Sequence, residues 1–275
     1  MTDIWYHFRK NRVAVVGAGV LVFMSLVALA GPAFAPYDPF AFVALQMQPP
    51  SAQHWMGTDD LGRDVLSRFI YGTRVSMFVG TLAALTSVVV GISIGAVAGY
   101  FGGIVDQALM RTAELFQVLP QFFLAMVLVA LFGASYLIII LVIGLLSWPN
   151  VARLARSEFL SLRERDYVLA VRALGLPTWR TIFSEILPNA APALVVAATI
   201  QFSLAILLEA SLSFIGLGDP SYPSWGQMLN GAQPVFRQAW WVALFPGVGV
   251  FLTVAALNLL GDGLNDMQNP KLQAL

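Results

Sequence analysis

The polar segment between Asp166 and Asn189, DYVLAVRALGLPTWRTIFSEILPN, has residue types and a spacing suited to binding a partner. Asp166 can cap a helix, because its side chain can accept from free backbone N–H groups at the helix start. Gly175 can end that helix in the left-handed conformation, and Pro177 prevents it from resuming. The apolar residues of this predicted helix share one face: Tyr167, Ala170, Val171 and Leu174. Because so short a helix is marginal in water, we expect it to be docked.

Charged residues inside apolar stretches are the second set of candidates, because such groups cost about 2.5 to 3.5 kcal/mol at a helix centre on insertion scales. Glu209 lies near the outer end of an apolar run and has no local partner. It can bind a substrate amine or hydrogen-bond a neighbouring helix, and it is our candidate for a translocation path. Asp106, Arg111 and Glu114 cluster at the start of another run. The i, i+3 spacing of Arg111 and Glu114 favours a structural pair over a proton relay.

Several kinds of chemistry are not expected in this chain. It has no cysteine, and His7 and His54 are its two histidines, so neither thiol catalysis nor a histidine-based zinc site is expected. Its two lysines do not fit a nucleotide-binding P-loop, because Lys10 is followed by Asn11 and Lys271 by Leu272. We therefore predict no catalytic residue, no metal site and no cofactor of its own. The net charge of zero gives no sign of a nucleic-acid partner.

The composition predicts an all-α, polytopic membrane protein. Of 275 residues, 58% are hydrophobic and 11% charged, whereas a soluble protein carries roughly a quarter charged residues. Six apolar runs predict six transmembrane helices, at about 13–34, 76–98, 108–131, 136–148, 190–214 and 241–260. We expect the fourth helix to extend to 162. The first run suits an uncleaved span better than a signal peptide.

The basic residues predict the orientation of the spans. With the N-terminus inside, eleven of the 15 lysines and arginines fall on the cytoplasmic side: Arg9, Lys10, Arg12, Arg111, Arg153, Arg156, Arg163, Arg165, Arg172, Arg180 and Lys271. The positive-inside rule then places both termini, and the segment between Asp166 and Asn189, in the cytoplasm. Gly91, Gly95 and Gly99 form a small-residue ridge in the second run. We expect this ridge to pack within the chain, and a seam with a second chain stays open.

Three separated motifs resemble one family. The segment described above is similar to the EAA loop of ABC-transporter permease subunits, whose pattern is Glu-Ala-Ala, a Gly four residues after the second Ala, and Leu-Pro thirteen residues later. Here Leu169, Ala170 and Val171 occupy the core, with two departures, and are followed by Gly175 and then Leu187-Pro188. The stretches MGTDDLGRDVLSRFIYGTR (Met56–Arg74) and EASLSFIGLG (Glu209–Gly218) resemble the dipeptide, oligopeptide and nickel importer branch.

The resemblance implies a type I ABC importer permease fold and ATP-driven import of dipeptides, oligopeptides or a related small substrate. It implies that the helix between Asp166 and Gly175 couples to an ATPase, where Arg172 can pair with an acid. The implied partners are a second, homologous permease chain in a heterodimer, two P-loop ATPases that bind ATP and Mg²⁺, and a periplasmic or other extracytoplasmic substrate-binding protein. The implied location is the inner membrane of a prokaryote.

The resemblance also suggests a division of the chain. Residues 1–74 would form a tail, the first span and an outer amphipathic loop; residues 75–264 would form the permease domain, with the coupling loop at 150–189; and residues 265–275 would form a cytoplasmic tail. In the outer loop, the spacing of Leu61, Val65 and Phe69, beside an Asp64–Arg68 pair, predicts an amphipathic helix on the outer membrane face. It would either frame the outer mouth or act as a plain interfacial anchor.

Two further features of the outer segments complete the sequence-based description. Asp59 and Asp60 are expected to cap a helix start rather than to bind a metal. The segment 216–240 has the composition of a turn-rich loop. Two functions of other classes remain as alternatives to the importer. One is a transporter driven by an ion gradient, and the other is a membrane scaffold that tethers a cytoplasmic partner without transport.

Overall fold

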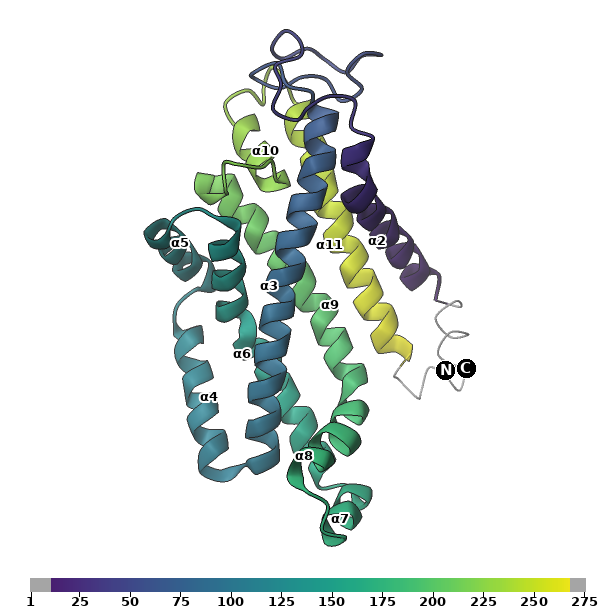
Figure 1. The fold of residues 1–275 in the computed structure, drawn as a ribbon, viewed down its shortest axis with the longest axis vertical. Coiled ribbons are helices and arrows are strands. Elements are labelled where there is room, and N and C mark those ends of the chain that lie inside the picture. Colours follow the sequence, from purple (N-terminus) through teal and green to yellow (C-terminus); the bar gives the residue numbers. More distant parts are fainter. Residues whose placement is uncertain (1–10, 268–275) are drawn as a thin grey trace.

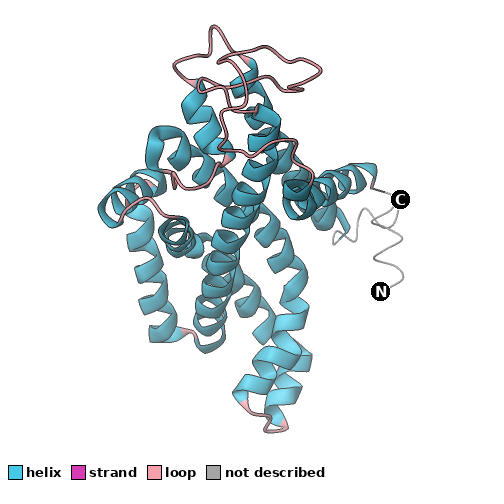
Figure 2. Cartoon of the chain, turned by 45° about the horizontal axis from the view of Figure 1, so that its top comes forward, coloured by secondary structure: helices cyan, strands magenta, loops and turns pink. Residues whose placement is uncertain are grey.

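The computed structural model describes residues 11–267, and the regular elements in this range are helices (Figures 1 and 2). In chain order they are α2 (Arg12–Ala30), η1 (Gly31–Ala33), α3 (Val65–Phe101), α4 (Gly103–Val118), α5 (Gln121–Phe132), α6 (Tyr136–Arg163), α7 (Asp166–Ala173), α8 (Thr178–Arg180), η2 (Thr181–Ile186), α9 (Leu187–Leu212), η3 (Ser213–Leu217), α10 (Trp225–Ala232) and α11 (Trp241–Met267). The short elements η2 and η3 are π-helical and flank α9.

Five helical segments are long and apolar enough to cross a membrane. They contain α2, α3, α6, α9 and α11, and they confirm the first, second, fourth, fifth and sixth predicted spans. The helix α6 continues through Pro149 to Arg163, as expected for the fourth span. At 37 residues, α3 is longer than the roughly 20 residues that a bilayer requires, so it extends beyond the hydrocarbon core.

The third predicted span is wrong as a single helix. It is divided into α4 and α5, which meet at an angle of 81° across Leu119 and Pro120. Leu119 has an extended backbone (φ −93°, ψ 139°), because a residue that precedes proline is disfavoured in the helical region. A sixth span exists only if this bent pair is counted as one crossing.

The glycine ridge of α3 packs within the chain against α6. A Cβ atom built on Gly91 would lie 2.6 Å from the Cβ atom of Val151, and one built on Gly99 would lie 2.7 Å from the carbonyl oxygen of Arg156. Only glycine leaves room for the two helices to approach this closely. The ridge therefore makes the central contact of the bundle, as the spacing of its small residues indicated.

The outer amphipathic helix predicted around Leu61, Val65 and Phe69 does not form as a separate element. The helix α3 starts at Val65 and runs unbroken to Phe101, while Leu61 lies in the preceding loop. Asp64 caps α3, because its Oδ2 accepts from the Ser67 N–H at 2.8 Å. The predicted division at residues 74 and 75 therefore falls inside one helix.

Asp59 caps a turn rather than a helix, which corrects the sequence-based prediction. Its Oδ1 accepts from the backbone N–H groups of Leu61 and Arg63, each at 2.9 Å. The predicted Asp64–Arg68 pair is also wrong. Asp64 Oδ1 lies 2.9 Å from His54 Nδ1, and Arg68 Nε lies 3.5 Å from Asp59 Oδ2. The loop folds over the end of α3 and supplies both partners.

The segment 216–240 contains a helix that its composition did not indicate. In α10, Ser224 Oγ accepts from the N–H of Gln227 at 3.3 Å, and Trp225 is fully buried. This helix packs on α11, α3 and α9 at the same end of the molecule as the loop that precedes α3 (Figure 1).

The two described chain ends lie together, because Asn11 Nδ2 donates to Asp266 Oδ2 at 3.4 Å. The expectations for the terminal basic residues Arg9, Lys10 and Lys271 lie outside the described residues. The helix α7 is at the opposite end of the molecule from the loop that precedes α3 (Figure 1).

Candidate functional site

The helix predicted between Asp166 and Gly175 is present, and it ends as expected. Gly175 has φ +77°, in the left-handed region. Its N–H donates to the Arg172 carbonyl at 3.0 Å, and the Leu176 N–H donates to the Val171 carbonyl at 3.4 Å. This pair of bonds defines a Schellman motif, which ends a helix sharply.

Asp166 does not cap the helix through its side chain. Arg165 occupies the N-cap position without a side-chain hydrogen bond, and Asp166 is the first helical residue. A carboxylate in the first turn still stabilises a helix, because the helix dipole is positive there. The capping prediction is therefore wrong, although the residue stays at the helix start.

One face of α7 anchors it to the body of the protein. Val168 is fully buried there in an apolar cluster whose other buried members are Ala96, Ala155, Phe159, Ile186, Ala190 and Leu194. These residues come from α3, α6, η2 and α9, so α7 packs where several long helices converge. Sequence reasoning missed Val168, because it lies outside the apolar face that the i, i+3, i+4 spacing defined.

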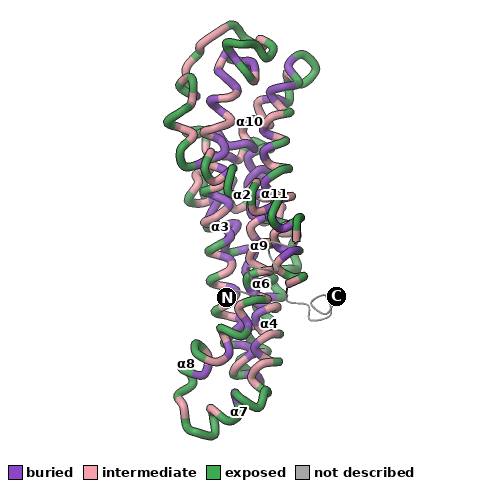
Figure 3. Tube along the Cα trace, turned by 90° about the vertical axis from the view of Figure 1, so that its right-hand side faces the viewer, coloured by how far each residue is buried: buried purple, intermediate pink, exposed green. Residues whose placement is uncertain are grey.

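The predicted apolar face of α7 points away from this anchor. Ala170 and Tyr167 are exposed, Leu174 is 79% exposed, and Val171 is half-buried. Figure 3 shows α7 mostly in the colour of exposed residues. Two large side chains that sequence reasoning missed extend the exposed apolar area beyond α7: Trp179 and Phe183. An apolar surface of this kind at a helical end suits a partner that covers it.

Two arginines connect this region to the end of α3. Arg163 Nη1 donates to the carbonyl oxygens of Gly99 at 3.0 Å and Tyr100 at 3.2 Å. The Cζ atom of Arg172 lies 5.9 Å from the centroid of the Tyr100 ring, in cation–π geometry. The Arg163 bonds join the end of α6 to the end of α3, and the Arg172 contact joins α7 to α3.

The Leu187–Pro188 pair marks the entry to α9. Leu187 is the first residue of α9, and Pro188 is the second. The π-helical turn η2 precedes the pair, and Ile186 at its end is buried in the same cluster as Val168. The predicted coupling residues therefore lie on one connected structure.

Replacing Gly175 by valine should uncouple this structure without unfolding the bundle. A Cβ atom at Gly175 would meet no atom within 4 Å, so only the left-handed backbone opposes the substitution. That cost is about 1–2 kcal/mol, or a roughly five- to thirtyfold loss of correctly formed helix end. We expect a similar fall in the rate of ATP-driven uptake. Gly175→Asn is the control, because asparagine tolerates the left-handed region. Equal uptake by the valine variant and the parent would contradict the prediction.

Glu209 forms a buried hydrogen-bonded junction between three helices. Its Oε1 accepts from Ser213 Oγ at 2.8 Å, and its Oε2 accepts from Ser76 Oγ at 3.3 Å. Ser76 Oγ in turn accepts from the N–H of Trp225 at 3.1 Å. Glu209 is fully buried, so this geometry favours hydrogen bonding between α3, α9 and α10 over binding of a substrate amine.

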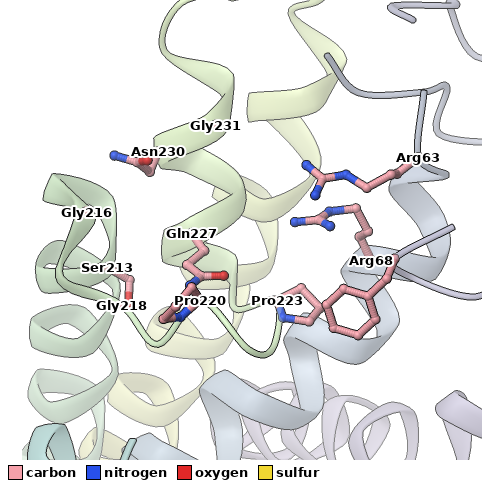
Figure 4. A pocket seen from close by; sticks show the side chains of 11 residues that line it. Arg63, Arg68, Ser213, Gly216, Gly218, Pro220, Pro223, Gln227, Asn230 and Gly231 are labelled. Carbon is pink, nitrogen blue, oxygen red and sulfur yellow. The ribbon is translucent and has the colours of Figure 1, made fainter. Parts of the chain in front are cut away.

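A cavity of about 320 Å³ lies between α10 and the loop that precedes α3, at the opposite end of the molecule from α7 (Figure 1). Arg63 and Arg68 line one side of it, and Gln227 and Asn230 line the other (Figure 4). Arg63 Nε donates to Asp59 Oδ2 at 2.7 Å, which holds the first guanidinium in place. The combination of guanidinium and amide groups suits hydrogen bonding to a polar surface.

The cluster at the start of the third predicted span divides into two ion pairs. Arg111 Nη1 lies 2.9 Å from Glu114 Oε2 in an exposed pair, as the spacing indicated. Asp106 instead binds Arg156 of α6, with Nη2 donating to Oδ2 at 2.6 Å. This second pair is 50 residues apart in sequence, so local spacing could not reveal it.

Comparison with known proteins agrees with this geometry. Residues 91–274 match the family model described as binding-protein-dependent transport system inner membrane component. Residues 1–54 match the N-terminal transmembrane domain of oligopeptide transport permease C. The chain belongs to the family of binding-protein-dependent transport permeases.

Individual relatives are similar over nearly their whole length. The chain is 39% identical to the dipeptide transport system permease protein DppC of Bacillus subtilis, over 98% of this chain and 86% of that one. It is 36% identical to the oligopeptide transport system permease protein OppC of the same organism, over 98% and 90% of the two chains. A solved chain of the MetNI methionine ABC transporter superposes with a TM-score of 0.59 at 20% identity, over 73% of this chain and 96% of that one. The last likeness establishes the type I ABC importer permease fold.

Proposed function

We propose that this chain is one of two permease subunits of an ATP-driven importer for peptides, and that α7 is the helix through which cytoplasmic ATPases drive it. The observation that carries the proposal is the two-sided character of α7. Val168 fixes it to the bundle, while Leu174 and its exposed neighbours face outward. A helix that is anchored on one face and apolar on the other can transmit the movement of a partner.

In this scheme the two ATPases close when they bind ATP and Mg²⁺, and they carry α7 with them. The long helices that meet at Val168 then rock and open the path toward the outer side, and hydrolysis resets them. The residues that touch the ATPase are Tyr167, Ala170, Val171 and Leu174. Arg172 is exposed and lies over the Tyr100 ring in this chain, and it would pair with an acid on the ATPase.

The outer end would receive a substrate-binding protein. The folded loop before α3, together with α10, presents the cavity lined by Arg63, Arg68, Gln227 and Asn230. Its guanidinium and amide groups would hydrogen-bond to the binding protein during delivery of the substrate. Glu209 links α10 to α3 through Ser76, and it would hold α10 in the position that forms this cavity.

The remaining parts of the proposal follow from the family and the relatives. Peptides are the proposed substrate class, because two relatives that match over nearly their whole length are named as dipeptide and oligopeptide permeases. The second permease chain would be homologous but different, and the complex would lie in the inner membrane with both termini in the cytoplasm. A gradient-driven transporter would require neither ATPase subunits nor this form of α7. A scaffold would use α7 to tether its partner, but it would not require ATP-driven uptake.

Affinity purification in mild detergent tests the proposal. We expect the chain to retain a second permease chain and one or two P-loop ATPases, identified by mass spectrometry. A variant with a scrambled sequence between Asp166 and Gly175 should lose the ATPases and keep the second permease. Purification of the chain alone, under conditions where an established ABC importer stays assembled, would refute the proposed function.

A further inference from the structure

The exposed face of α6 changes its chemical character at Pro149. Before Pro149, the exposed residues of α6 are Leu137, Leu141 and Leu145. After it, a different set is exposed, which we call the polar stripe: Asn150, Arg153, Ser157 and Ser161. Steps of three and four residues place the members of this stripe on one face of the helix.

The polar stripe begins within the inner half of the apolar span of α6. Asn150 lies near the middle of the 28-residue helix α6, about 20 Å from each of its ends. The apolar run of α6 begins at Leu137, and a hydrocarbon core about 30 Å thick covers about 20 residues of helix from there. Asn150 and Arg153 therefore fall within its inner half, and Ser157 falls at its inner boundary. Exposed polar side chains at this depth need water or protein as neighbours, because lipid cannot satisfy them.

The contacts within the chain leave the stripe incompletely satisfied. Asn150 Oδ1 accepts from Gln117 Nε2 at 2.9 Å and from Arg153 Nη2 at 3.2 Å. Within residues 11–267, Arg153 forms no ion pair with a carboxylate. Its charge therefore faces outward at membrane depth, which is costly against hydrocarbon and inexpensive against water.

Two cavities lie on either side of the stripe. One of about 560 Å³ is lined by Asn150 together with Glu158 and Gln201, between α6 and α9. The other, of about 370 Å³, is lined by Arg153 and by residues of α4. Gln201 is buried except where it lines the first cavity. Its side chain makes no hydrogen bond to the described residues. The polar stripe thus lies between two cavities, and both are lined in part by polar groups.

We infer that the polar stripe of α6 forms the inner half of the wall of a hydrated substrate path, completed by the second permease chain. The inference rests on the proposed importer function and names residues for it. The path suits hydrophilic solutes that carry amide and carboxylate groups. Asn150 and the serines offer hydrogen bonds to amides, and Arg153 offers an unpaired positive charge to a carboxylate.

The absence of cysteine in the natural chain makes a direct test possible. Single cysteines are placed at Asn150 and Ser157 in the stripe, and at Leu145 on the apolar face of the same helix. Ser157→Cys exchanges one oxygen for sulfur and should leave the fold intact. The test can therefore be read from position 157 even if Asn150→Cys misfolds. The assembled complex in inside-out membrane vesicles is treated with a charged, membrane-impermeant maleimide, and labelling of this chain is followed with time. The thiolate is the reactive form, and a thiol in apolar surroundings resists ionisation.

We expect labelling at positions 150 and 157 to be several times faster than at 145. Trapping the ATPases with ATP and vanadate should change the rate at 150 and leave the rate at 145 unchanged. Labelling of all three positions at one slow rate would overturn the inference, since it would mean lipid or a dry contact with the second permease. An unchanged labelling rate at position 150 after trapping, in a complex shown to import the dipeptide, would also overturn the inference. ATP-driven uptake of a radiolabelled dipeptide by the unmodified complex is measured in parallel, which separates a failure of the importer function from a failure of the stripe.

Discussion

Substitution of Gly95 by leucine should abolish accumulation of the folded protein. A Cβ atom at this position would overlap the carbonyl oxygen of Ala152 and lie 2.7 Å from the Cβ atom of Ala155 and 2.9 Å from the Arg156 N atom. Two of these three atoms belong to the backbone of α6, so no side-chain rotation relieves the contact. Overpacking costs about 1–3 kcal/mol where neighbours can move, and we expect at least the upper value here.

The measurement is the amount and melting temperature of the detergent-purified chain. Gly19→Leu is the matched control, because a Cβ atom there has no atom within 4 Å and Gly19 is exposed on α2. The control should resemble the parent, while Gly95→Leu should give little monodisperse protein. Normal yield and melting temperature for Gly95→Leu would show that α3 and α6 do not pack through the glycine ridge.

Replacing Leu174 by aspartate should release the ATPases while the permease stays folded. Leu174 is 79% exposed, so the fold loses little when it is replaced. Burial of a leucine side chain in an interface contributes about 1.5–3 kcal/mol, so its loss should weaken ATPase binding by about ten- to a hundredfold. The aspartate must also be desolvated in an apolar groove, which adds to this effect.

Co-purification of the ATPases and the ATP-driven uptake rate are the two readouts for Leu174. Leu174→Met is the control, because it conserves volume and apolar character and should retain both. The elution volume of the detergent-solubilised chain reports whether the permease remains folded. Full retention of the ATPases by Leu174→Asp would show that Leu174 of α7 is not part of the ATPase interface, and it would refute the proposed coupling.

The sequence by itself determined the features that depend on neighbouring residues and on total apolar length. Five of the six spans follow from runs of apolar residues, because a membrane-spanning helix needs only sufficient length and hydropathy. The end of α7 follows from Gly175, since the left-handed position at a helix terminus is a local requirement. The Arg111–Glu114 pair likewise follows from its spacing along one helix.

Only the tertiary structure decided which distant groups meet. Asp64 has Arg68 one turn away, yet it binds His54, because the folded loop brings an imidazole to the start of α3. Asp106 finds its partner on α6, and Glu209 finds serines on two elements. A buried polar group takes whichever partner the packing supplies, and sequence spacing describes only the partners within one helix.

The direction of each helical face was decided in the same way. Hydropathy shows that α6 spans a membrane, but the change from an apolar to a polar exposed face at Pro149 appears only when α4 and α9 are in place around it. Similarly, Val168 and Leu174 are both apolar residues of one short segment, and packing against Phe159 and Ile186 buries the first and leaves the second free. Burial is a property of the neighbours that surround a side chain, so the residues that hold α7 and those it offers to a partner are separated by the fold alone.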